Sequence, residues 1–285
     1  MSFKSAVFGG PRVSVIIPTY GRAEMLDGLL GSIRKSAPRE AIELVVVSSD
    51  LQDSQKVRRL LSQDDLTVIF AGQRKGRQLR RQSLYSFTNL GIKRSTFEWV
   101  FVVNDDMTFD EDWYSQFSKI VSDPRNNNVG MVIVASHIGS IDLGIRVAKV
   151  GRAKVRGNWE DVWLSDFSLI RRDVLESIGF FDEQLQWYGS GVDNSLKVRF
   201  LTQSEIYVAE QIRIHHHIAQ ENRNPHTESS YLDFRYLQQK WNSWCANNGC
   251  EYQIDFGYNI NSLFQALKYR LIRLVGRVHS CIERK

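Results

Sequence analysis

Apolar runs alternate along the first half of the chain with segments in which apolar residues recur at helical spacing. A continuous apolar run predicts a strand buried on both faces, because a half-exposed strand would alternate apolar and polar residues. Such strands are predicted at residues 13–17, 43–47, 66–71 and 99–103. Helices are predicted at residues 23–35, 54–61, 82–93 and 110–122. This order predicts an α/β fold in which parallel strands are joined by right-handed crossovers.

The second half of the chain departs from this strict alternation. Strands are predicted at residues 129–135, 163–170 and 206–214, with an extended segment at 145–155 in a small antiparallel portion. Helices are predicted at residues 174–178, 193–202 and 231–247, and a helical extension at 260–285. We therefore expect a Rossmann-like, mostly parallel sheet that is flanked by helices and followed by a C-terminal helical extension.

An acidic pair follows the predicted strand at residues 99–103, where the chain reads Asn104, Asp105, Asp106. Adjacent carboxylates at the end of a buried strand repel each other and lose hydration, so they stay ionised only beside a cation or several hydrogen-bond donors. Open α/β sheets bind ligands at this edge. Mg²⁺ and Mn²⁺ prefer oxygen ligands and commonly link carboxylates to substrate phosphates. The sequence therefore predicts an ion between these carboxylates and a diphosphate.

The composition is that of an ordinary globular protein, with 285 residues, 42% hydrophobic and 24% charged. No run approaches the roughly 20 apolar residues of a membrane-spanning helix. The first twelve residues lack the apolar core of a secretory signal. The three cysteines form no Cys-x-x-Cys pair, so reduced thiols are expected. We expect a cytoplasmic protein.

A net charge of +5 favours anionic partners, and two segments concentrate the positive charge. Residues 74–81 contain five cations, which fits a phosphate-facing loop, a nucleic-acid patch or a solvated charged run. No recognised nucleic-acid motif accompanies them and an acidic edge lies nearby, so we expect no nucleic-acid partner. The leucine stripe and basic residues of 260–285 fit a helix on the inner face of an anionic membrane, or one docked on the protein or a second subunit.

A set of motifs, in order and at regular spacings, resembles one protein family. They are VSVIIPTYGR at 13–22, NLGI at 89–92, NDD at 104–106, FSLIRR at 167–172, GFFDE at 179–183 and GVDNSLKVR at 191–199. Together they resemble a family-2 glycosyltransferase with the nucleotide-sugar-binding GT-A fold. The resemblance implies metal-dependent transfer of a sugar, usually with inversion, from a nucleotide diphosphate donor to an acceptor hydroxyl. The acceptor would be a glycan or a lipid-linked glycan.

The resemblance also implies roles for individual residues. Asp106 would bind Mn²⁺ or Mg²⁺, and His215 or His217 would complete the metal site, since alternate residues of a strand share a face. An exposed or core histidine is the alternative. Contacts to the nucleotide or its diphosphate are expected from Pro18, Thr19, Tyr20, Arg22, Asp50, Arg80, Arg81, Asn89, Asn104 and Asp105.

The general base that deprotonates the acceptor is placed by the resemblance at Asp193, beside a glycine turn at a helix start. The alternative for Asp193 is simple N-capping of that helix. The domain organisation implied is a GT-A domain at 1–255, with a nucleotide-binding half at about 13–106 and an acceptor half at about 107–217. The basic tail occupies 256–285.

Three positions depart from the pattern of the family. Asn104 stands where an Asp is usual, and Val192 stands where another acid is frequent. The second strand ends in two serines instead of an acid, which leaves Asp50 or Asp53 to contact the base. These departures support an alternative function, a catalytically silent nucleotide-sugar-binding or scaffold protein with the same fold.

Overall fold

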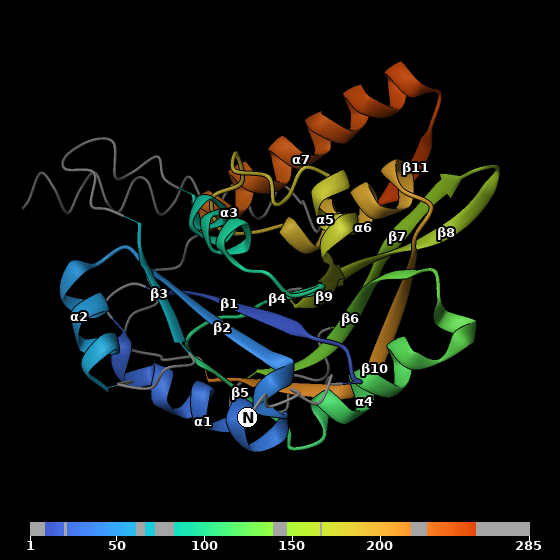
Figure 1. Ribbon diagram of the computed structural model, residues 1–285. Helices are drawn as coiled ribbons and strands as arrows, with labels where there is room; N and C mark the ends of the chain where they lie inside the picture. The colour runs from blue at the N-terminus through green and yellow to red at the C-terminus, as the bar shows by residue number, and fades with distance from the viewer. Residues whose placement is uncertain are drawn as a thin grey trace, which may run out of the picture.

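Two sheets organise the chain, whose computed structural model describes residues 9–19, 22–60, 66–71, 83–138, 147–165, 167–217 and 227–254. The larger sheet has the strand order β3-β2-β1-β4-β9-β6-β10-β5, and the smaller has the order β11-β7-β8 (Figure 1). The strands are β1 (Val13–Thr19), β2 (Ile42–Ser48), β3 (Leu66–Phe70), β4 (Trp99–Val102), β5 (Met107–Phe109), β6 (Val129–Ile138), β7 (Val147–Val155), β8 (Asn158–Ser165), β9 (Ser168–Arg171), β10 (Glu205–His216) and β11 (Glu251–Ile254). The helices are α1 (Leu26–Ser36), α2 (Leu51–Leu60), α3 (Leu84–Arg94), α4 (Trp113–Ser122), α5 (Arg172–Ser177), α6 (Ser190–Leu201) and α7 (Thr227–Asn248).

Strands β1 to β4 run parallel in the larger sheet, as the alternation of apolar runs and helical segments predicted. β1 pairs in parallel with β2 on one side and with β4 on the other, and β2 pairs in parallel with β3. All seven residues of β1 are buried, which agrees with a strand covered on both faces. The mixed α/β fold with a mostly parallel sheet and a small antiparallel sheet is therefore confirmed.

The segment at 163–170 was predicted as one strand, and that prediction is wrong. The chain changes sheets here: β8 pairs antiparallel with β7 in the small sheet, whereas β9 enters the large sheet between β4 and β6. β9 is antiparallel to both neighbours, so β6 runs in the same direction as β4, and β10 is parallel to β6. The short strands β5 and β11 were not predicted.

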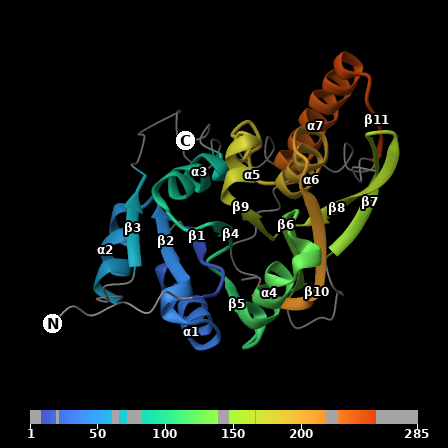
Figure 2. The same ribbon diagram turned by 45° about the vertical axis from the view of Figure 1, so that its right-hand side comes forward.

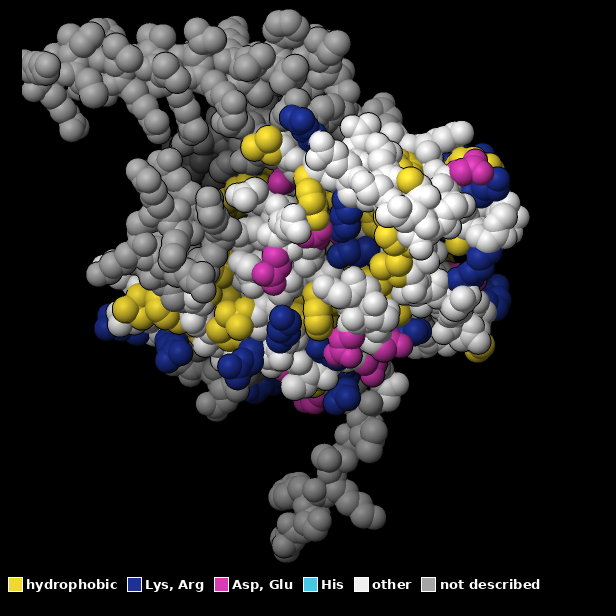
Figure 3. Space-filling model, turned by 90° about the horizontal axis from the view of Figure 1, so that it is seen from above, with side chains coloured by type: hydrophobic (Ala, Val, Ile, Leu, Met, Phe, Trp, Pro, Cys, Tyr) yellow, Lys and Arg dark blue, Asp and Glu magenta, His cyan; other side chains and the backbone are white. Residues whose placement is uncertain are grey.

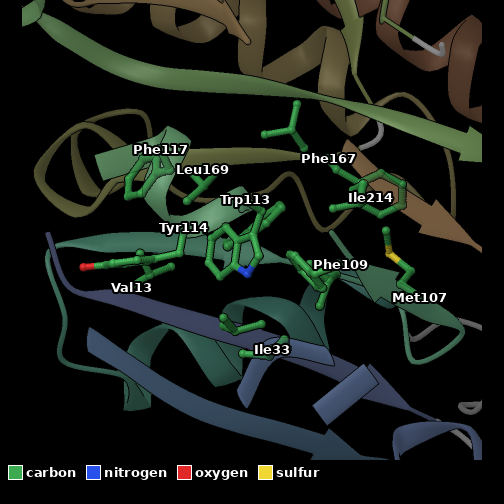
Figure 4. Close-up of a cluster of buried hydrophobic side chains, with 14 of the residues drawn as sticks. Val13, Ile33, Met107, Phe109, Trp113, Tyr114, Phe117, Phe167, Leu169 and Ile214 are labelled. Atoms are coloured by element: carbon green, nitrogen blue, oxygen red, sulfur yellow. The ribbon is translucent and has the colours of Figure 1, made fainter. Parts of the chain in front are cut away.

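Helices cover both faces of the large sheet and bury two apolar cores. In Figures 1 and 2, α1 and α4 lie on one side of the sheet, whereas α3, α5, α6 and α7 lie on the other. Side chains of α1, α2 and α4 pack with β1, β4 and β10 in the first core. Aromatic rings dominate its centre, where Phe109 and Trp113 have ring centroids 5.0 Å apart (Figure 4). The second core joins β1, β2 and β6 to α3, α5, α6 and α7.

Gly91 sets how closely α3 approaches the sheet. A Cβ at this position would lie 2.6 Å from Cγ2 of Ile16 and 2.8 Å from Cγ2 of Val47, closer than carbon atoms can pack. Only glycine therefore lets α3 rest directly on β1 and β2.

Two basic segments of the sequence fall outside the described residues. The cations of residues 74–81 lie within 72–82, and the tail lies within 255–285. Within the part of the chain that the structure describes, no helix combines the length and apolar character needed to cross a bilayer. Seen from the side of α3, α5, α6 and α7, described Lys and Arg side chains are interspersed with Asp and Glu (Figure 3).

Candidate functional site

The strand directions bring four separate segments of sequence to one edge of the large sheet. β1, β2 and β4 are parallel, so Thr19, Asp50 and the acidic pair Asp105–Asp106 all lie at or just beyond their carboxyl ends. β10 runs the same way and delivers its last residues to the same edge, where the backbone N–H of His217 donates to the Asp106 carbonyl over 2.7 Å. This is the edge at which open α/β sheets bind ligands.

Asp105 is completely buried, and two neighbours hold its carboxylate. β1 and β4 are paired in parallel up to Ile16 and Val102, and just beyond this pairing the Thr19 hydroxyl donates to Asp105 Oδ2 over 2.7 Å. Arg22 donates to both carboxylate oxygens, from Nε over 3.2 Å and from Nη2. Burial raises the pKa of Asp105 to about 6, even though Arg22 and Thr19 favour the charged form.

Asp106 sits beside the same arginine but faces a histidine. Arg22 Nη1 donates to its Oδ2 over 3.2 Å, and Nε2 of His216 lies 3.0 Å from its Oδ1. Burial on its own would raise the pKa of Asp106, but His216 and Arg22 together hold it below the usual value. Asp106 therefore stays ionised more readily than Asp105.

The histidine at this edge is His216, not one of the two that the strand alternation favoured. His215 Nε2 lies 2.7 Å from Asp110 Oδ1, and His217 Nε2 lies 2.7 Å from Thr108 Oγ1. The expectation that His215 or His217 completes the metal site stays a prediction, and the structure brings the ring of His216 to Asp106 instead. The side chains of a strand point alternately to its two faces. The sequence of three adjacent histidines does not show which of them points to the face with Asp106.

The Asp106–His216 pair fits a divalent ion. Asp106 Oδ1 is buried and receives no aligned hydrogen bond among the described residues, although the imidazole nitrogen is only 3.0 Å away. An octahedral ion with ligands at about 2.1 Å separates neighbouring ligands by about 3 Å, so both atoms can bind one ion. Within the described ranges no group of three or more His, Cys, Asp or Glu side chains is arranged to hold a metal ion, so this pair would supply two protein ligands at most from those residue types. The remaining ligands would be water or substrate, as is usual for Mg²⁺.

Three other residues predicted to contact the nucleotide, Asn104, Pro18 and Asp50, lie in or directly after strands that end at this edge. Asn104 Nδ2 lies 3.4 Å from His216 Nε2, and Pro18 is a buried residue of β1. Asp50 follows β2, and its Oδ1 accepts from the backbone N–H of Gln52 over 2.8 Å at the start of α2. Tyr20, Arg80 and Arg81 fall outside the described residues.

The amide of Asn89 holds α3 against the turn at residues 181–183. Its Nδ2 donates to the Phe181 carbonyl and to Glu183 Oε1, each over 2.9 Å, and its Oδ1 accepts from the Phe181 N–H over 3.1 Å. Both ends of the buried amide are engaged in fastening α3 to this turn, and the expected contact of Asn89 with the donor stays a prediction. The NLGI motif marks a clamp between α3 and the 181–183 turn.

Asp193 is completely buried within a group of charges between α6 and α7. Its Oδ1 accepts from Lys240 Nζ over 2.7 Å and from Trp241 Nε1 over 2.9 Å, and its Oδ2 lies 3.1 Å from Lys197 Nζ. The capping alternative is wrong, because Gly189, with φ of 84°, is the N-cap residue of α6 and Asp193 lies in its first turn. A general base must reach the proton that it accepts. Asp193 as the base therefore stays a prediction that requires α7 to uncover it.

Asp182 extends this group, which we call the α6–α7 charge cluster and define as Asp182, Asp193, Lys197 and Lys240. Lys240 Nζ bridges the two carboxylates, with 2.7 Å to Asp182 Oδ2 and 2.7 Å to Asp193 Oδ1. The Tyr236 hydroxyl also donates to Asp182 Oδ2, over 2.8 Å. Burial would raise the pKa of Asp182, but Lys240, Tyr236 and the N–H of Gln184 hold it below its usual value. The charges of the two carboxylates and the two lysines balance. Because Lys240 belongs to α7 and Asp182 and Asp193 do not, the cluster fastens α7 to the body of the protein.

A family comparison matches most of the region that forms this edge. The sequence model described as glycosyl transferase family 2 matches residues 14–179, more than half of the 285 residues. The O-antigen biosynthesis protein RfbC of Myxococcus xanthus is 24% identical over 247 residues, which cover 79% of this chain and 19% of that protein. The uncharacterized protein y4gI of Sinorhizobium fredii (strain NBRC 101917 / NGR234) is 24% identical over 260 residues, covering 82% of this chain and 28% of that protein. The chain thus spans less than a third of each curated relative.

Solved structures show the same fold at low sequence identity. S. aureus TarS 1-349 in complex with UDP-GlcNAc superposes with a TM-score of 0.57 at 16% identity, covering 78% of this chain and 65% of that chain. Mannosyltransferase PcManGT from Pyrobaculum calidifontis, in complex with GDP-Man and Mn²⁺, superposes with a TM-score of 0.54 at 19% identity, covering 81% and 65%. The likeness is one of fold, the GT-A fold that these two structures share.

Proposed function

Because the chain belongs to glycosyl transferase family 2, we propose that it transfers a sugar from a nucleotide diphosphate donor to an acceptor hydroxyl, with inversion. The observation that carries the proposal is the convergence of Asp105, Asp106, Arg22 and His216 at the carboxyl edge of the sheet. Asp106 and His216 have the spacing of two ligands on one Mn²⁺ or Mg²⁺ ion. The cationic Arg22 contacts both carboxylates and would pair with the diphosphate.

The chemistry proposed for this edge follows from charge. Departure of the nucleoside diphosphate concentrates negative charge on the leaving oxygens, and a bound divalent ion would supply Lewis-acid stabilisation there. Asp106 and His216 would hold that ion, and Asp105, fixed by Thr19, would lie next to the ribose. The guanidinium of Arg22 would donate hydrogen bonds to the phosphate oxygens.

The base that receives the acceptor proton is proposed to be Asp193, on the family resemblance. The acceptor hydroxyl becomes a stronger nucleophile as a carboxylate removes its proton, which typically contributes about 10²–10⁴ in rate. For this role the α6–α7 charge cluster must open, because Lys240 and Trp241 bind the oxygen that would take the proton.

The donor and acceptor classes are proposed by analogy. TarS is solved with UDP-GlcNAc and PcManGT with GDP-Man, so uridine and guanosine diphosphate sugars are the first donors to test. The likeness to an O-antigen biosynthesis protein supports a glycan or lipid-linked acceptor in polysaccharide synthesis. Peripheral binding to the inner face of a membrane through residues 256–285 is part of the proposal. Deleting residues 260–285 should then release the protein from anionic liposomes.

The direct test is release of nucleoside diphosphate from a panel of UDP- and GDP-sugars, with Mn²⁺ or Mg²⁺ and with mixed oligosaccharide and lipid-linked acceptors. We expect one donor to be consumed by the wild-type protein and Asp106→Asn to lower its turnover by about 10²-fold or more. The matched control is Asp110→Asn, which removes a carboxylate of the same segment that pairs with His215 instead. Binding of none of the donors, with or without metal, would refute the proposal.

Two further variants test the base. If Asp193 is the base, Asp193→Asn should lower kcat by about 10²-fold or more while Lys240→Met keeps most of the activity. If Asp193 only anchors α7, both variants should lower the melting temperature and the activity together. The second pattern would remove Asp193 from the mechanism.

A second candidate function is favoured by two contacts: Arg22 already neutralises the acidic pair, and Asp193 is buried among lysines. On this account the protein binds a nucleotide sugar without turning it over. Tight donor binding, with the same negligible rate of donor loss in the wild-type and Asp106→Asn proteins, would favour this candidate over the transferase.

A further inference from the structure

The acidic pair already has a cation beside it, and the chain itself supplies that cation. Arg22 donates from Nε to Asp105 Oδ2 and from Nη1 to Asp106 Oδ2, each over 3.2 Å, and from Nη2 to Asp105 Oδ1. One guanidinium thus contacts three of the four carboxylate oxygens. The fourth, Asp106 Oδ1, is the oxygen that faces His216.

Arg22 is also the member of this group that can leave most easily. Its side chain is 35% exposed, whereas the side chains of Asp105 and Asp106 are 0% and 7% exposed. The Arg22 carbonyl accepts from the N–H of Met25 over 3.0 Å, which ties its backbone to the start of the first helical segment. A change of side-chain rotamer is therefore sufficient to move the guanidinium without unpacking a core.

A divalent ion and Arg22 compete for the same oxygens. An ion shared by Asp106 and His216 would lie next to the guanidinium of Arg22, and two positive charges at such a short distance repel each other. A diphosphate offers the guanidinium an alternative, since planar guanidinium groups pair with phosphate oxygens through two hydrogen bonds. Ion and nucleotide would therefore favour each other's binding, and thermodynamic coupling of this kind is reciprocal.

We propose that Arg22 is an internal counter-ion that occupies the cation position of Asp105 and Asp106, and that it moves to the donor diphosphate when a divalent ion binds. The proposal deepens the proposed function and rests on the nucleotide-binding half of it. It assigns to Arg22 the coupling between metal and donor, so that the ion binds weakly until the nucleotide arrives.

The test measures binding of Mn²⁺ alone to the full-length protein by electron paramagnetic resonance of the free ion. Two neutral variants, Arg22→Gln and Arg22→Met, should bind Mn²⁺ about tenfold more tightly than the wild-type protein, a change of about 1.4 kcal/mol. Arg22→Lys keeps the charge and should bind more weakly than either. The matched control is Arg125→Gln, which removes an exposed arginine paired with Asp123 and should match the wild type.

The second arm repeats the titration with saturating UDP and, separately, GDP. At least one nucleotide should tighten Mn²⁺ binding to the wild-type protein by about tenfold or more, and to the neutral variants by less, because they have no guanidinium to transfer. Neutral variants that bind Mn²⁺ alone no better than the wild type would overturn the proposal. So would equal nucleotide coupling in the wild-type protein and the two neutral variants, or no Mn²⁺ binding by any of the proteins tested.

These measurements need no sugar transfer, so the two proposals fail separately. The predicted Mn²⁺ pattern without consumption of any donor would support the counter-ion role and count against the transferase. Donor consumption with an unchanged Mn²⁺ affinity in the neutral variants would support the transferase and overturn the counter-ion role.

Discussion

Asp105 and Asp106 are neighbours in sequence, yet the fold gives them opposite electrostatic surroundings. Burial raises the pKa of Asp105 to about 6, whereas the imidazole of His216 and the charge of Arg22 hold the pKa of Asp106 below its usual value. Arg22 contacts both carboxylates, but only Asp105 also accepts from the Thr19 hydroxyl, and only Asp106 has an imidazole nitrogen beside it, with which it can share a divalent ion.

Substitution of His216 and, separately, of its neighbour His217 tests which histidine binds the ion. His216→Ala should weaken Mn²⁺ binding by at least about tenfold, because it removes an imidazole whose Nε2 lies 3.0 Å from Asp106 Oδ1. His217→Ala, which removes an exposed ring next to Thr108, should leave Mn²⁺ binding unchanged. Titrations in the presence of UDP or GDP measure both. Equal affinities for the two variants would contradict the assignment of His216.

The sequence located the acidic pair, but it did not show which histidine lies beside that pair or which residues Asn89 contacts. The acidic pair was located correctly at the sheet edge, because a continuous apolar strand ending in two acids needs only local information. The choice among three adjacent histidines needed the pairing of β10 with β5, a contact between segments about 100 residues apart. The structural contacts of Asn89 were not predicted for the same reason, since its partners at Phe181 and Glu183 are remote in sequence.

Secondary-structure elements in the first half of the chain were predicted closely, and those around the sheet switch were not. The apolar runs of β1, β2 and β3 and the helical spacing of α1 and α3 are properties of local sequence. The division of 163–170 into β8 and β9 depends on which sheet each part joins, and both parts have the same apolar pattern. The sequence likewise did not predict that α6 begins at Ser190 with Gly189 as its N-cap residue, which places Asp193 in the first turn of the helix.

The packing of α3 against the sheet gives a prediction about two glycines in helices. Gly91→Ala should lower the free energy of unfolding by about 1–3 kcal/mol, because the new methyl would overlap Ile16 and Val47. Gly31→Ala is the matched control: Gly31 lies in α1 with no atom within 4 Å of its added Cβ, and alanine there should stabilise by about 0.5–1 kcal/mol. Urea denaturation measures both. A Gly91→Ala protein as stable as the wild type would contradict the close approach of α3.

On the scale of the whole molecule, α7 closes the second core through the α6–α7 charge cluster. The pKa of Asp182 is lower in the folded protein than in the unfolded chain, where it is about 3.9. The stability contributed by Asp182 is therefore complete above that value and is lost as the pH falls through the folded pKa. Its charge is held by Lys240, so acid should loosen α7 from the body of the protein.

This pH dependence can be measured by denaturation between pH 7 and pH 3. Asp182→Asn should cost about 1.5–3 kcal/mol at pH 7, as expected for a charged hydrogen-bonded group, and the difference from wild type should shrink as the pH falls below about 4. Asp161→Asn, a change in a surface pair with Lys149, should follow the wild-type pH dependence. A difference between Asp182→Asn and wild type that stays constant down to pH 3 would contradict the account.

The architecture explains why one edge collects the functional groups. β9 enters the sheet in the opposite direction to β4 and β6, which leaves β10 running with β4, so that residues about 200 positions apart, Thr19 and His216, end at the same edge. The sequence predicted a parallel α/β sheet, from which the position of the site follows. The direction of β9 was not predictable from its four residues alone.

The central claim is that this edge binds a nucleotide diphosphate through a divalent ion, and the most direct measurement is the anomalous diffraction of a crystal grown with Mn²⁺ and the nucleotide diphosphate that the protein binds. The account predicts a manganese peak within coordination distance of Asp106 and His216 Nε2, with the diphosphate on its other side and the Arg22 guanidinium turned to the phosphates. A nucleotide bound at another surface, or a manganese ion that contacts neither Asp106 nor His216, would contradict it.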